Sequence, residues 1–349
     1  MEAGVFASTS QAGFKSVQDT LADYPVIANG IDSCCYEKTA AGILAMPLMV
    51  QALLPVFILI MLGHVFRRID FPGGDFWPQA ERFTYYVLFP AMLVFKLGQA
   101  RLPASAYGDI ALLIGAMLIA MTLILAIAQW FWRWSGPVFS SVYQGAIRFN
   151  SYVGLAAGGM LLGDQGLSLT AIAVAIMVPL LNLLCILMFS LVATEGPVRL
   201  VPVFKAIVTN PLIVGSVIGV VWSFFEIGFH PLIGGILEPL SNLALPMGLM
   251  TVGAGLQLKA LRGASLPFIV SSALKLVGFP LMTAGLALLL GLEGMMVQVA
   301  VLLSALPTAT SAYILARQLG GDAPLMAGII SGQTLLAIVT IPLMLSILW

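Results

Sequence analysis

The chain has 349 residues, of which 60% are hydrophobic and only 9% are charged, and its formal net charge at pH 7 is +0. A soluble domain carries about 25% charged residues, so this chain lacks the charged side chains that a water-facing surface needs. The composition predicts a membrane protein in contact with the lipid bilayer. With no basic stripe, it excludes a nucleic-acid-binding protein.

The first 45 residues differ from the rest because they are polar and show no apolar periodicity. They also lack the basic start and apolar core of a signal peptide. We predict that residues 1–45 are disordered or an artefactual N-terminal extension, and that the membrane protein begins at Met46.

Ten apolar segments follow, each long enough to cross a bilayer as a helix of about 20 residues. Turns rich in Gly and Pro separate most of them. The predicted spans are 47–66, 76–98, 107–133, 138–162, 166–192, 202–225, 231–257, 266–290, 294–317 and 323–349. The predicted fold class is an all-α polytopic membrane protein with ten transmembrane helices.

Basic residues gather on one side of these spans. The odd-numbered connections and their flanks contain Arg67, Arg68, Arg82, Arg133, Arg199, Lys205, Lys259, Arg262 and Arg317. The even-numbered ones contain only Lys96 and Arg101. Because basic residues favour the cytoplasmic side, we predict that both termini are extracytoplasmic, with the chain in the cytoplasmic (inner) membrane.

The two parts of the chain, 46–192 and 193–349, repeat each other at a nearly constant offset. The matched positions are Pro55 with Pro211, Gly63 with Gly219, Pro90 with Pro246, and Asp164 with Asp322. Five spans in each part is an odd number, so the second copy runs through the membrane in the opposite direction. The sequence predicts a 5+5 inverted repeat, an architecture of several transporter families.

Arg148 lies about ten residues into the fourth span, roughly 15 Å deep and near the bilayer midplane. Burying an arginine there costs about 2.5–3.5 kcal/mol on insertion scales, so a partner must offset the cost. The acidic residues of the spans lie near the span ends. The partner is therefore a backbone carbonyl freed at a helix break, water in a cavity, or an anionic ligand. Arg148 either contacts substrate or only stabilises the break.

Polar residues at matching places interrupt the fourth and ninth spans. Asn150 and Ser151 follow Arg148, and the ninth span carries Pro307, Thr308, Thr310 and Ser311. Proline removes an N–H group, and a broken helix exposes N–H groups that favour an anion. The alternative is an ordinary proline kink with hydroxyls bonded to the preceding turn. Because the interruptions are paired, we predict a substrate-binding site here.

Lys275 lies within the eighth span, where it either snorkels to the interface or stabilises the scaffold, or adds a second positive charge to an anion pathway. Asn182, Gln333 and Thr334 are predicted to be bridges between helices. No catalytic cluster, metal-ligand spacing or cofactor motif is present in the sequence, so we expect no cofactor.

Several stretches resemble the auxin efflux carrier family of membrane transporters, which includes bacterial permeases and plant PIN-type carriers. They are residues 53–68, 85–91, 144–155 and 305–322, and the most specific strings are Arg148-Phe149-Asn150-Ser151 and Leu306-Pro307-Thr308-Ala309-Thr310. The resemblance covers residues 46–349.

This resemblance implies a scaffold of helices 1, 2, 6 and 7, often dimeric, and a transport unit of helices 3–5 and 8–10. Broken helices 4 and 9 would cross at the site, and an elevator-like motion would carry it across. Asn150 matches an asparagine that binds substrate carboxylate in plant members. Phe149 departs from the plant proline, and Thr308 and Thr310 replace a polar amide. The resemblance therefore implies small mono- or dicarboxylates such as malate or malonate rather than auxin.

The predicted function is a carrier of small organic anions that works by alternating access. With no acidic residue predicted at mid-membrane, potential-driven transport is favoured over a buried-carboxylate proton relay, and sodium- or proton-coupled symport remains the alternative. A polytopic membrane enzyme would need a cluster of catalytic side chains at a membrane face. In a non-transporting sensor, the paired interruptions would have no functional role.

Overall fold

The computed structural model describes residues 33–99, 104–192, 209–263 and 265–349. The chain divides into two units, Met1–Ala41 and Gly42–Trp349, and the account below concerns the second. Residues 1–32, which make up most of the predicted extension, lie outside the described residues. So do three basic residues used to predict the orientation, Arg101, Arg199 and Lys205.

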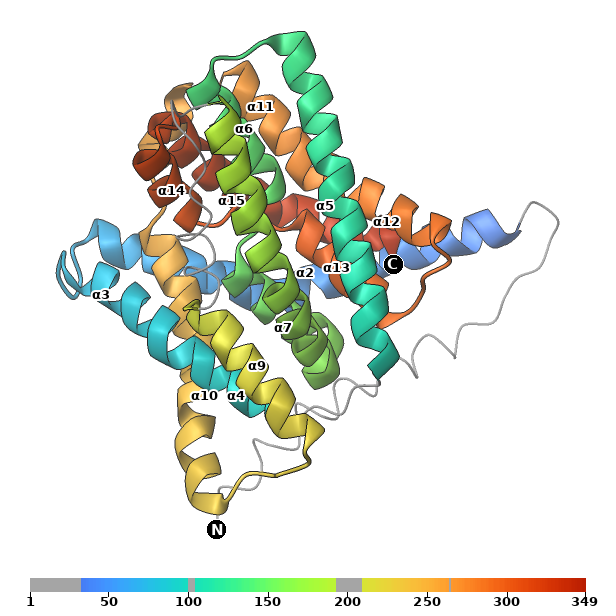
Figure 1. Cartoon of the computed structure of the whole chain (residues 1–349), viewed down its shortest axis with the longest axis vertical. Coiled ribbons are helices and arrows are strands. Elements are labelled where there is room, and N and C mark those ends of the chain that lie inside the picture. Colours follow the sequence, from blue (N-terminus) through green and yellow to red (C-terminus); the bar gives the residue numbers. More distant parts are fainter. Residues whose placement is uncertain (1–32, 100–103, 193–208, 264) are drawn as a thin grey trace. The chain divides into compact units, whose positions relative to one another are not determined.

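The described part of the chain is helical, without a strand (Figure 1). The α-helices are α2 (Ser33–Arg68), α3 (Phe76–Phe83), α4 (Phe89–Gln99), α5 (Ala104–Trp132), α6 (Gly136–Ile147), α7 (Ser151–Val192), α9 (Pro211–Phe224), α10 (Pro231–Ala254), α11 (Leu266–Ala273), α12 (Phe279–Leu289), α13 (Met295–Ala305), α14 (Ser311–Leu319) and α15 (Ala323–Leu348). Two short π-helical turns, η1 (Thr84–Leu88) and η3 (Leu274–Gly278), and a 3₁₀ turn, η2 (Leu258–Gly263), complete them.

Six helical stretches of the described chain are long and apolar enough to cross a membrane, which confirms an all-α membrane protein. They are Met49–Arg68, Gly108–Trp132, Gly136–Phe189, Pro231–Ala254, Leu266–Leu289 and Ala323–Leu348. Two further apolar helices, Pro211–Phe224 and Met295–Ala305, are shorter. Helix α2 begins at Ser33, earlier than the span predicted from residue 47.

Two of the predicted spans are interrupted by extended backbone. Helix α6 ends at Ile147, Arg148 has a ψ of 154°, and α7 begins at Ser151. Helix α13 ends at Ala305, Leu306 has a ψ of 150°, and α14 begins at Ser311. We call residues 148–150 the first break and residues 306–310 the second break. Pro307 lacks the N–H group that would continue α13.

Within α7 the chain bends at Gly163, whose φ of 67° and ψ of −162° are not helical. Positive φ is accessible to glycine at little cost, because glycine has no Cβ. The bend falls between the predicted fourth and fifth spans. It therefore replaces the loop that the sequence suggested there.

Each π-helical turn immediately precedes a Phe-Pro pair. Turn η1 leads into Phe89-Pro90 of α4, and η3 leads into Phe279-Pro280 of α12. A proline inside a helix removes one hydrogen bond and its ring clashes with the carbonyl four residues before it. A π-helical turn contains one extra residue, which relieves that crowding without ending the helix.

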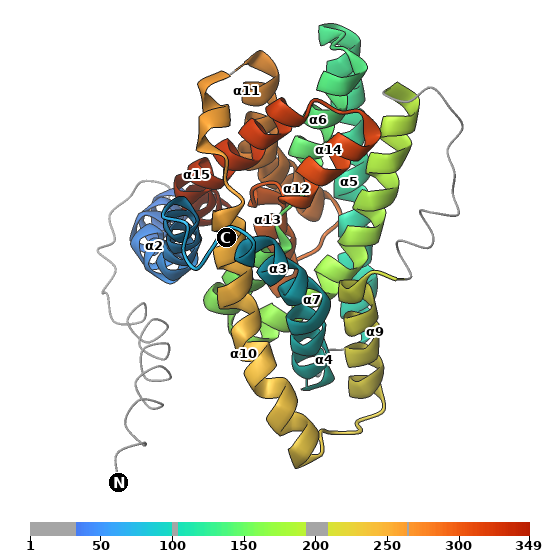
Figure 2. The same ribbon diagram turned by 90° about the vertical axis from the view of Figure 1, so that its left-hand side faces the viewer.

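Helix α4 packs against α9 and α10, while α7 packs against α6 and α13, and α15 packs against the same two helices (Figures 1 and 2). Glycines bring α2 close to α10 and α9 close to α4. A Cβ on Gly63 of α2 would lie 1.9 Å from the Met250 carbonyl oxygen of α10, and one on Gly219 of α9 would lie 2.8 Å from the Leu93 carbonyl oxygen of α4. Close approach through small residues is how membrane helices gain packing contacts.

Candidate binding site at the two helix breaks

The two breaks are in direct contact although they are far apart in the sequence. The backbone N–H of Asn150 donates to the carbonyl oxygen of Pro307 at 2.8 Å. An extended backbone cannot satisfy its own polar groups in a membrane, so each break needs partners from elsewhere. The contact shows that one break supplies a partner for the other.

Thr308 is fully buried at the second break, and its polar groups are held by neighbouring helices. Its N–H donates to Gln333 Oε1 at 3.0 Å, and its hydroxyl lies 2.7 Å from both that oxygen and the Gly145 carbonyl oxygen. Gln333 Nε2 donates to the same carbonyl at 3.0 Å. Thr308 therefore stabilises the break from inside, and its hydroxyl, with a single proton, is already committed.

Asn150 serves as the N-cap of α7. Its side chain is 2% exposed, and its Oδ1 accepts hydrogen bonds from the backbone N–H groups of Tyr152 and Val153 at 3.1 and 3.3 Å. These N–H groups belong to the first helical turn and have no partner within the helix. The Asn150 oxygen thus has a structural role in this conformation.

Arg148 is partly buried, and its guanidinium contacts three neutral side chains, one of which is Cys185. Its Nη1 donates to Asn182 Oδ1 and its Nη2 to Ser311 Oγ, both at 3.2 Å. Among the described residues, no carboxylate lies within ion-pairing distance of the guanidinium. A guanidinium has five N–H donors, so donors remain for an anion. The positive charge at the crossing of the breaks is uncompensated.

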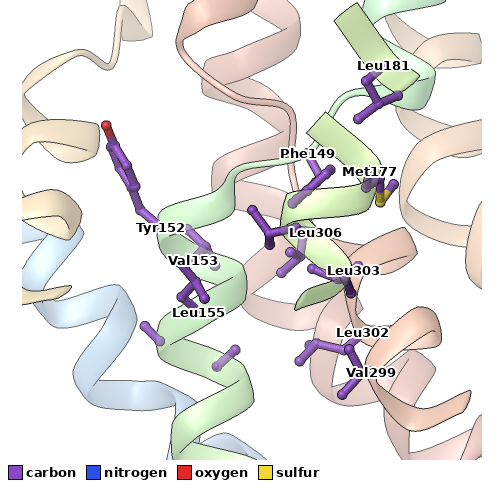
Figure 3. Packing of buried hydrophobic residues seen from close by; sticks show 14 of the residues in the cluster. Phe149, Tyr152, Val153, Leu155, Met177, Leu181, Val299, Leu302, Leu303 and Leu306 are labelled. Atoms are coloured by element: carbon purple, nitrogen blue, oxygen red, sulfur yellow. The ribbon is translucent and has the colours of Figure 1, made fainter. Parts of the chain in front are cut away.

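An apolar cluster lies beside the breaks (Figure 3). Phe149, Leu303 and Leu306 are 3%, 0% and 0% exposed and gather at its centre, whereas the ring of Tyr152 points away from it. A Cβ on Gly154 would lie 2.8 Å from Leu306 Cδ1, so α7 passes very close to α13. Dense packing on this side excludes water and confines polar access to the other side of the breaks.

A cavity of about 510 Å³ adjoins the second break. Thr310 lines it together with Arg67 and Glu81, and the Thr310 hydroxyl lies 3.4 Å from Glu81 Oε1. Clefts of about 300–1,000 Å³ typically hold small ligands. The cavity therefore reaches Thr310 at the end of the second break, whereas Arg148 and Ser311 are not among the residues that line it.

The remaining predicted site residues fall in different surroundings. Ser151 is partly buried as the first residue of α7, and Ser311 is exposed as the first residue of α14. Pro307 is buried and contributes its carbonyl oxygen. The structure thus brings Arg148 and Ser311 together, and joins Asn150 to Pro307.

Lys275 does not snorkel to the interface, so that one of the three alternatives is wrong. The side chain is 0% exposed, its Nζ lies 4.7 Å from the centroid of the Phe279 ring, and it has no hydrogen-bond partner among the described residues. It belongs to η3, which packs against α6, α13 and α15 inside the protein. Lys275 is not among the residues that line the cavity.

Sequence reasoning missed Glu81, which was placed near a span end and away from the site. Glu81 and Thr310 lie far apart in the sequence, and only the fold brings α3 against the start of α14. Asn182 and Gln333 were predicted to bridge helices, and each contacts a residue at or beside a break from another element. The same prediction is wrong for Thr334, whose hydroxyl donates to the Ile330 carbonyl of its own helix at 2.7 Å. In the part of the chain that the structure describes, no group of three or more His, Cys, Asp or Glu side chains could hold a metal ion.

Comparison with known proteins points to transport. Residues 193–345 match the family described as "Membrane transport protein". The chain is 25% identical over 297 residues to a protein of Methanothermobacter thermautotrophicus named "Uncharacterized transporter", covering 84% of this chain and 96% of the relative. It is 27% identical over 306 residues to the "Putative malonate transporter" of Rhizobium meliloti, covering 82% of this chain and 92% of the relative. These matches confirm the resemblance to a transporter family.

Proposed function

We propose that this multi-pass membrane protein, similar to membrane transport proteins over most of its length, is a secondary carrier of small organic anions across the cytoplasmic membrane. Its substrates in this proposal are mono- or dicarboxylates such as malate or malonate. One observation carries the proposal: the Arg148 guanidinium lies where the two helix breaks meet and has no carboxylate partner among the described residues.

A guanidinium that lacks a carboxylate partner in the described structure is costly at a helix break inside the membrane, and intramembrane charges usually serve a function. Asn182 and Ser311 offset part of that cost as hydrogen-bond acceptors. A carboxylate suits the remaining donors, because it can accept two parallel N–H bonds from one guanidinium. Helix α14 also begins at the second break without a side-chain cap, and helix N-termini favour anions.

For the architecture, we propose ten spans arranged as a 5+5 inverted repeat. The packing of repeat-related positions supports this: Gly63 lies against the Met250 carbonyl, and its counterpart Gly219 lies against the Leu93 carbonyl. In the repeat, Leu93 and Met250 occupy nearly equivalent positions of the second and seventh spans. In this proposal the scaffold consists of α2, α3–α4, α9 and α10, and it would pair with a second copy in a homodimer. The other helices would form the transport unit.

An elevator-type motion of that transport unit would expose the breaks alternately to the two sides of the membrane. The distribution of basic residues supports extracytoplasmic termini, which would place Arg67 at the cytoplasmic end of α2. Arg67 lines the cavity beside the second break, so the described conformation would be the one accessible from the cytoplasm. The membrane potential would drive movement of the anion, because it contributes about 2.3 kcal/mol per charge per 100 mV. The alternative is that sodium or proton gradients drive transport.

Flux measurements in proteoliposomes test this proposal. Labelled mono- and dicarboxylates are presented with membrane potential, sodium gradient and proton gradient set separately. Wild-type protein should show saturable flux of at least one acid. Arg148→Ala should abolish that flux, and Arg148→Lys should restore part of it because the charge is kept but the bidentate geometry is lost.

The matched control is Arg317→Ala, which removes an exposed arginine from α14 without touching the breaks. It should leave flux near the wild-type level. Undiminished flux in a correctly inserted Arg148→Ala variant would contradict a binding role for the guanidinium. Absence of flux for every acid with wild-type protein would refute organic anion transport.

A further inference from the structure

We propose that the ion pair between Lys96 and Asp164 is a latch that favours the described conformation, in which the cavity beside the second break is present. This inference rests on the proposed function, and it deepens that function by assigning what biases access to the site toward one side of the membrane. Within the described residues it is the only ion pair, and Lys96 Nζ lies 2.9 Å from Asp164 Oδ1.

The latch joins two groups of helices that the proposed motion would displace against each other. Lys96 lies in the last turn of α4, which belongs to the proposed scaffold, and the helix dipole favours a basic residue there. Asp164 belongs to α7 of the proposed transport unit and directly follows the bend at Gly163. A displacement of α7 along α4 therefore separates the two charged groups.

The latch and the cavity lie at opposite ends of the contact between these two groups of helices. Pro78 and Glu81 of α3 line the cavity, and the helical path continues through η1 into α4 (Figure 2). From Pro78 to Lys96 this path rises about 27 Å at 1.5 Å per residue, close to the roughly 30 Å thickness of the hydrocarbon core. In the predicted orientation the latch is therefore extracytoplasmic, and the cavity is on the cytoplasmic side.

An aromatic contact joins the same two helices nearer to the breaks. The rings of Phe89 in α4 and Tyr152 in α7 are stacked, with centroids 4.5 Å apart and an interplanar angle of 14°. Phe89 is fully buried, so water does not enter between these rings. The two groups of helices thus touch at the stacked rings and at the latch, and are hollow beside the second break. Alternating access requires such a conformation, which is open to one side only.

The second repeat has no counterpart of the latch. At the offset that relates the second and seventh spans, a buried valine, Val252, takes the place of Lys96. Asp322, the counterpart of Asp164, caps α15 and pairs with no basic side chain in the described part of the chain. In an inverted repeat, the two halves exchange environments between the two conformations. The latch therefore stabilises the described conformation without an equivalent contact in the opposite one.

The expected effect is modest because both charged groups contact water. The side chains of Lys96 and Asp164 are 28% and 86% exposed. Exposed pairs of this kind shift an equilibrium by up to about fivefold, and salt screens them. Because the pair exists in one conformation only, the whole of this shift acts on the balance between the two conformations.

Two single-cysteine probes measure that balance without any substrate. Ala254→Cys places a thiol in the cavity, and Ala156→Cys places one on α7, one turn after Tyr152 and on the face toward α4. Both are made in protein whose Cys34 and Cys35 are replaced by serine, because the third cysteine is buried. The rate of reaction with a polar maleimide is measured for each thiol in lipid nanodiscs, where the reagent reaches both faces. The ratio of the cavity rate to the α7 rate is proportional to the equilibrium constant between the two conformations.

Removing either charge should lower this ratio. Asp164→Asn and Lys96→Met should each lower it by up to about fivefold. The charge-reversed double variant, Lys96→Asp with Asp164→Lys, should restore it, which a purely steric role of either side chain does not explain. High salt should lower the ratio when the native pair is present and leave it unchanged in Asp164→Asn. Glu293→Gln is the matched control and should not change the ratio, because it removes an exposed carboxylate that forms no ion pair in the described structure.

Three results overturn the latch: an unchanged ratio in Asp164→Asn, a failure of charge reversal to restore the ratio, or an Ala156→Cys thiol that never reacts. If the substituted proteins do not fold, the salt dependence of the ratio with the native pair decides alone, and a ratio that does not vary with salt overturns the proposal. The flux assay separates this inference from the proposed function. Wild-type protein that transports no organic anion overturns the proposed function, whereas the thiol ratio tests the latch without requiring a substrate.

Discussion

Substitutions at Asn150 separate helix capping from contact with an anion. Asn150→Ala removes the oxygen that accepts hydrogen bonds from the Tyr152 and Val153 N–H groups. Loss of an N-cap costs about 0.5–2 kcal/mol. The position is 2% exposed, so little water can replace the lost acceptor, and we expect a decrease of about 1–2 kcal/mol in the free energy of unfolding. Asn150→Asp retains the acceptor oxygen and should lower the free energy of unfolding much less.

Equilibrium unfolding in mixed micelles, followed by tryptophan fluorescence, measures these free energies, and proteoliposome flux is measured on the same variants. Asn150→Asp should fold well but transport poorly, because its carboxylate competes with the substrate for the adjacent Arg148. Asp322→Ala is the matched control: it removes the N-cap that accepts from the Leu325 N–H at 3.0 Å in α15, and should lower stability similarly while keeping flux. Wild-type stability of Asn150→Ala would refute the capping argument.

Two further predictions concern packing. Gly63→Ala should not yield folded, monodisperse protein in size-exclusion chromatography, because the new Cβ would lie 1.9 Å from a backbone oxygen. Gly285→Ala should behave as wild type in the same assay, because nothing lies within 4 Å of its Cβ. Lys275→Met should raise the unfolding midpoint, because it replaces a fully buried ammonium without a hydrogen-bond partner in the described structure. The same variant should retain anion flux, and loss of flux in a stable Lys275→Met protein would instead support a place for Lys275 in the anion pathway.

Much of the site could be predicted from local chemistry. An arginine followed by asparagine inside an apolar segment, and a proline between hydroxyl residues in another, both disfavour a regular helix. The structure interrupts the helices at these places, between Ile147 and Ser151 and between Ala305 and Ser311. These signals depend on the residues themselves, so they do not need tertiary information.

Other features depend on which helices become neighbours. Glu81 of α3 reaches Thr310, the residue before α14, only through the tertiary fold, and no spacing in the sequence encodes that contact. One alternative for Lys275 was that its side chain reaches the interface, but Lys275 lies in a π-helical turn covered by neighbouring helices. The π-helical turns themselves were not predicted, because a proline within a helix can be accommodated in several ways.

The hydrogen bond between Asn150 and Pro307 has a consequence for the chain as an assembled whole. Residues 46–192 alone would leave the Asn150 amide without its acceptor, and residues 193–349 alone would leave the Pro307 carbonyl without its donor. Lipid cannot satisfy either group. Neither segment therefore satisfies its own backbone, and each needs the other to be present in the membrane.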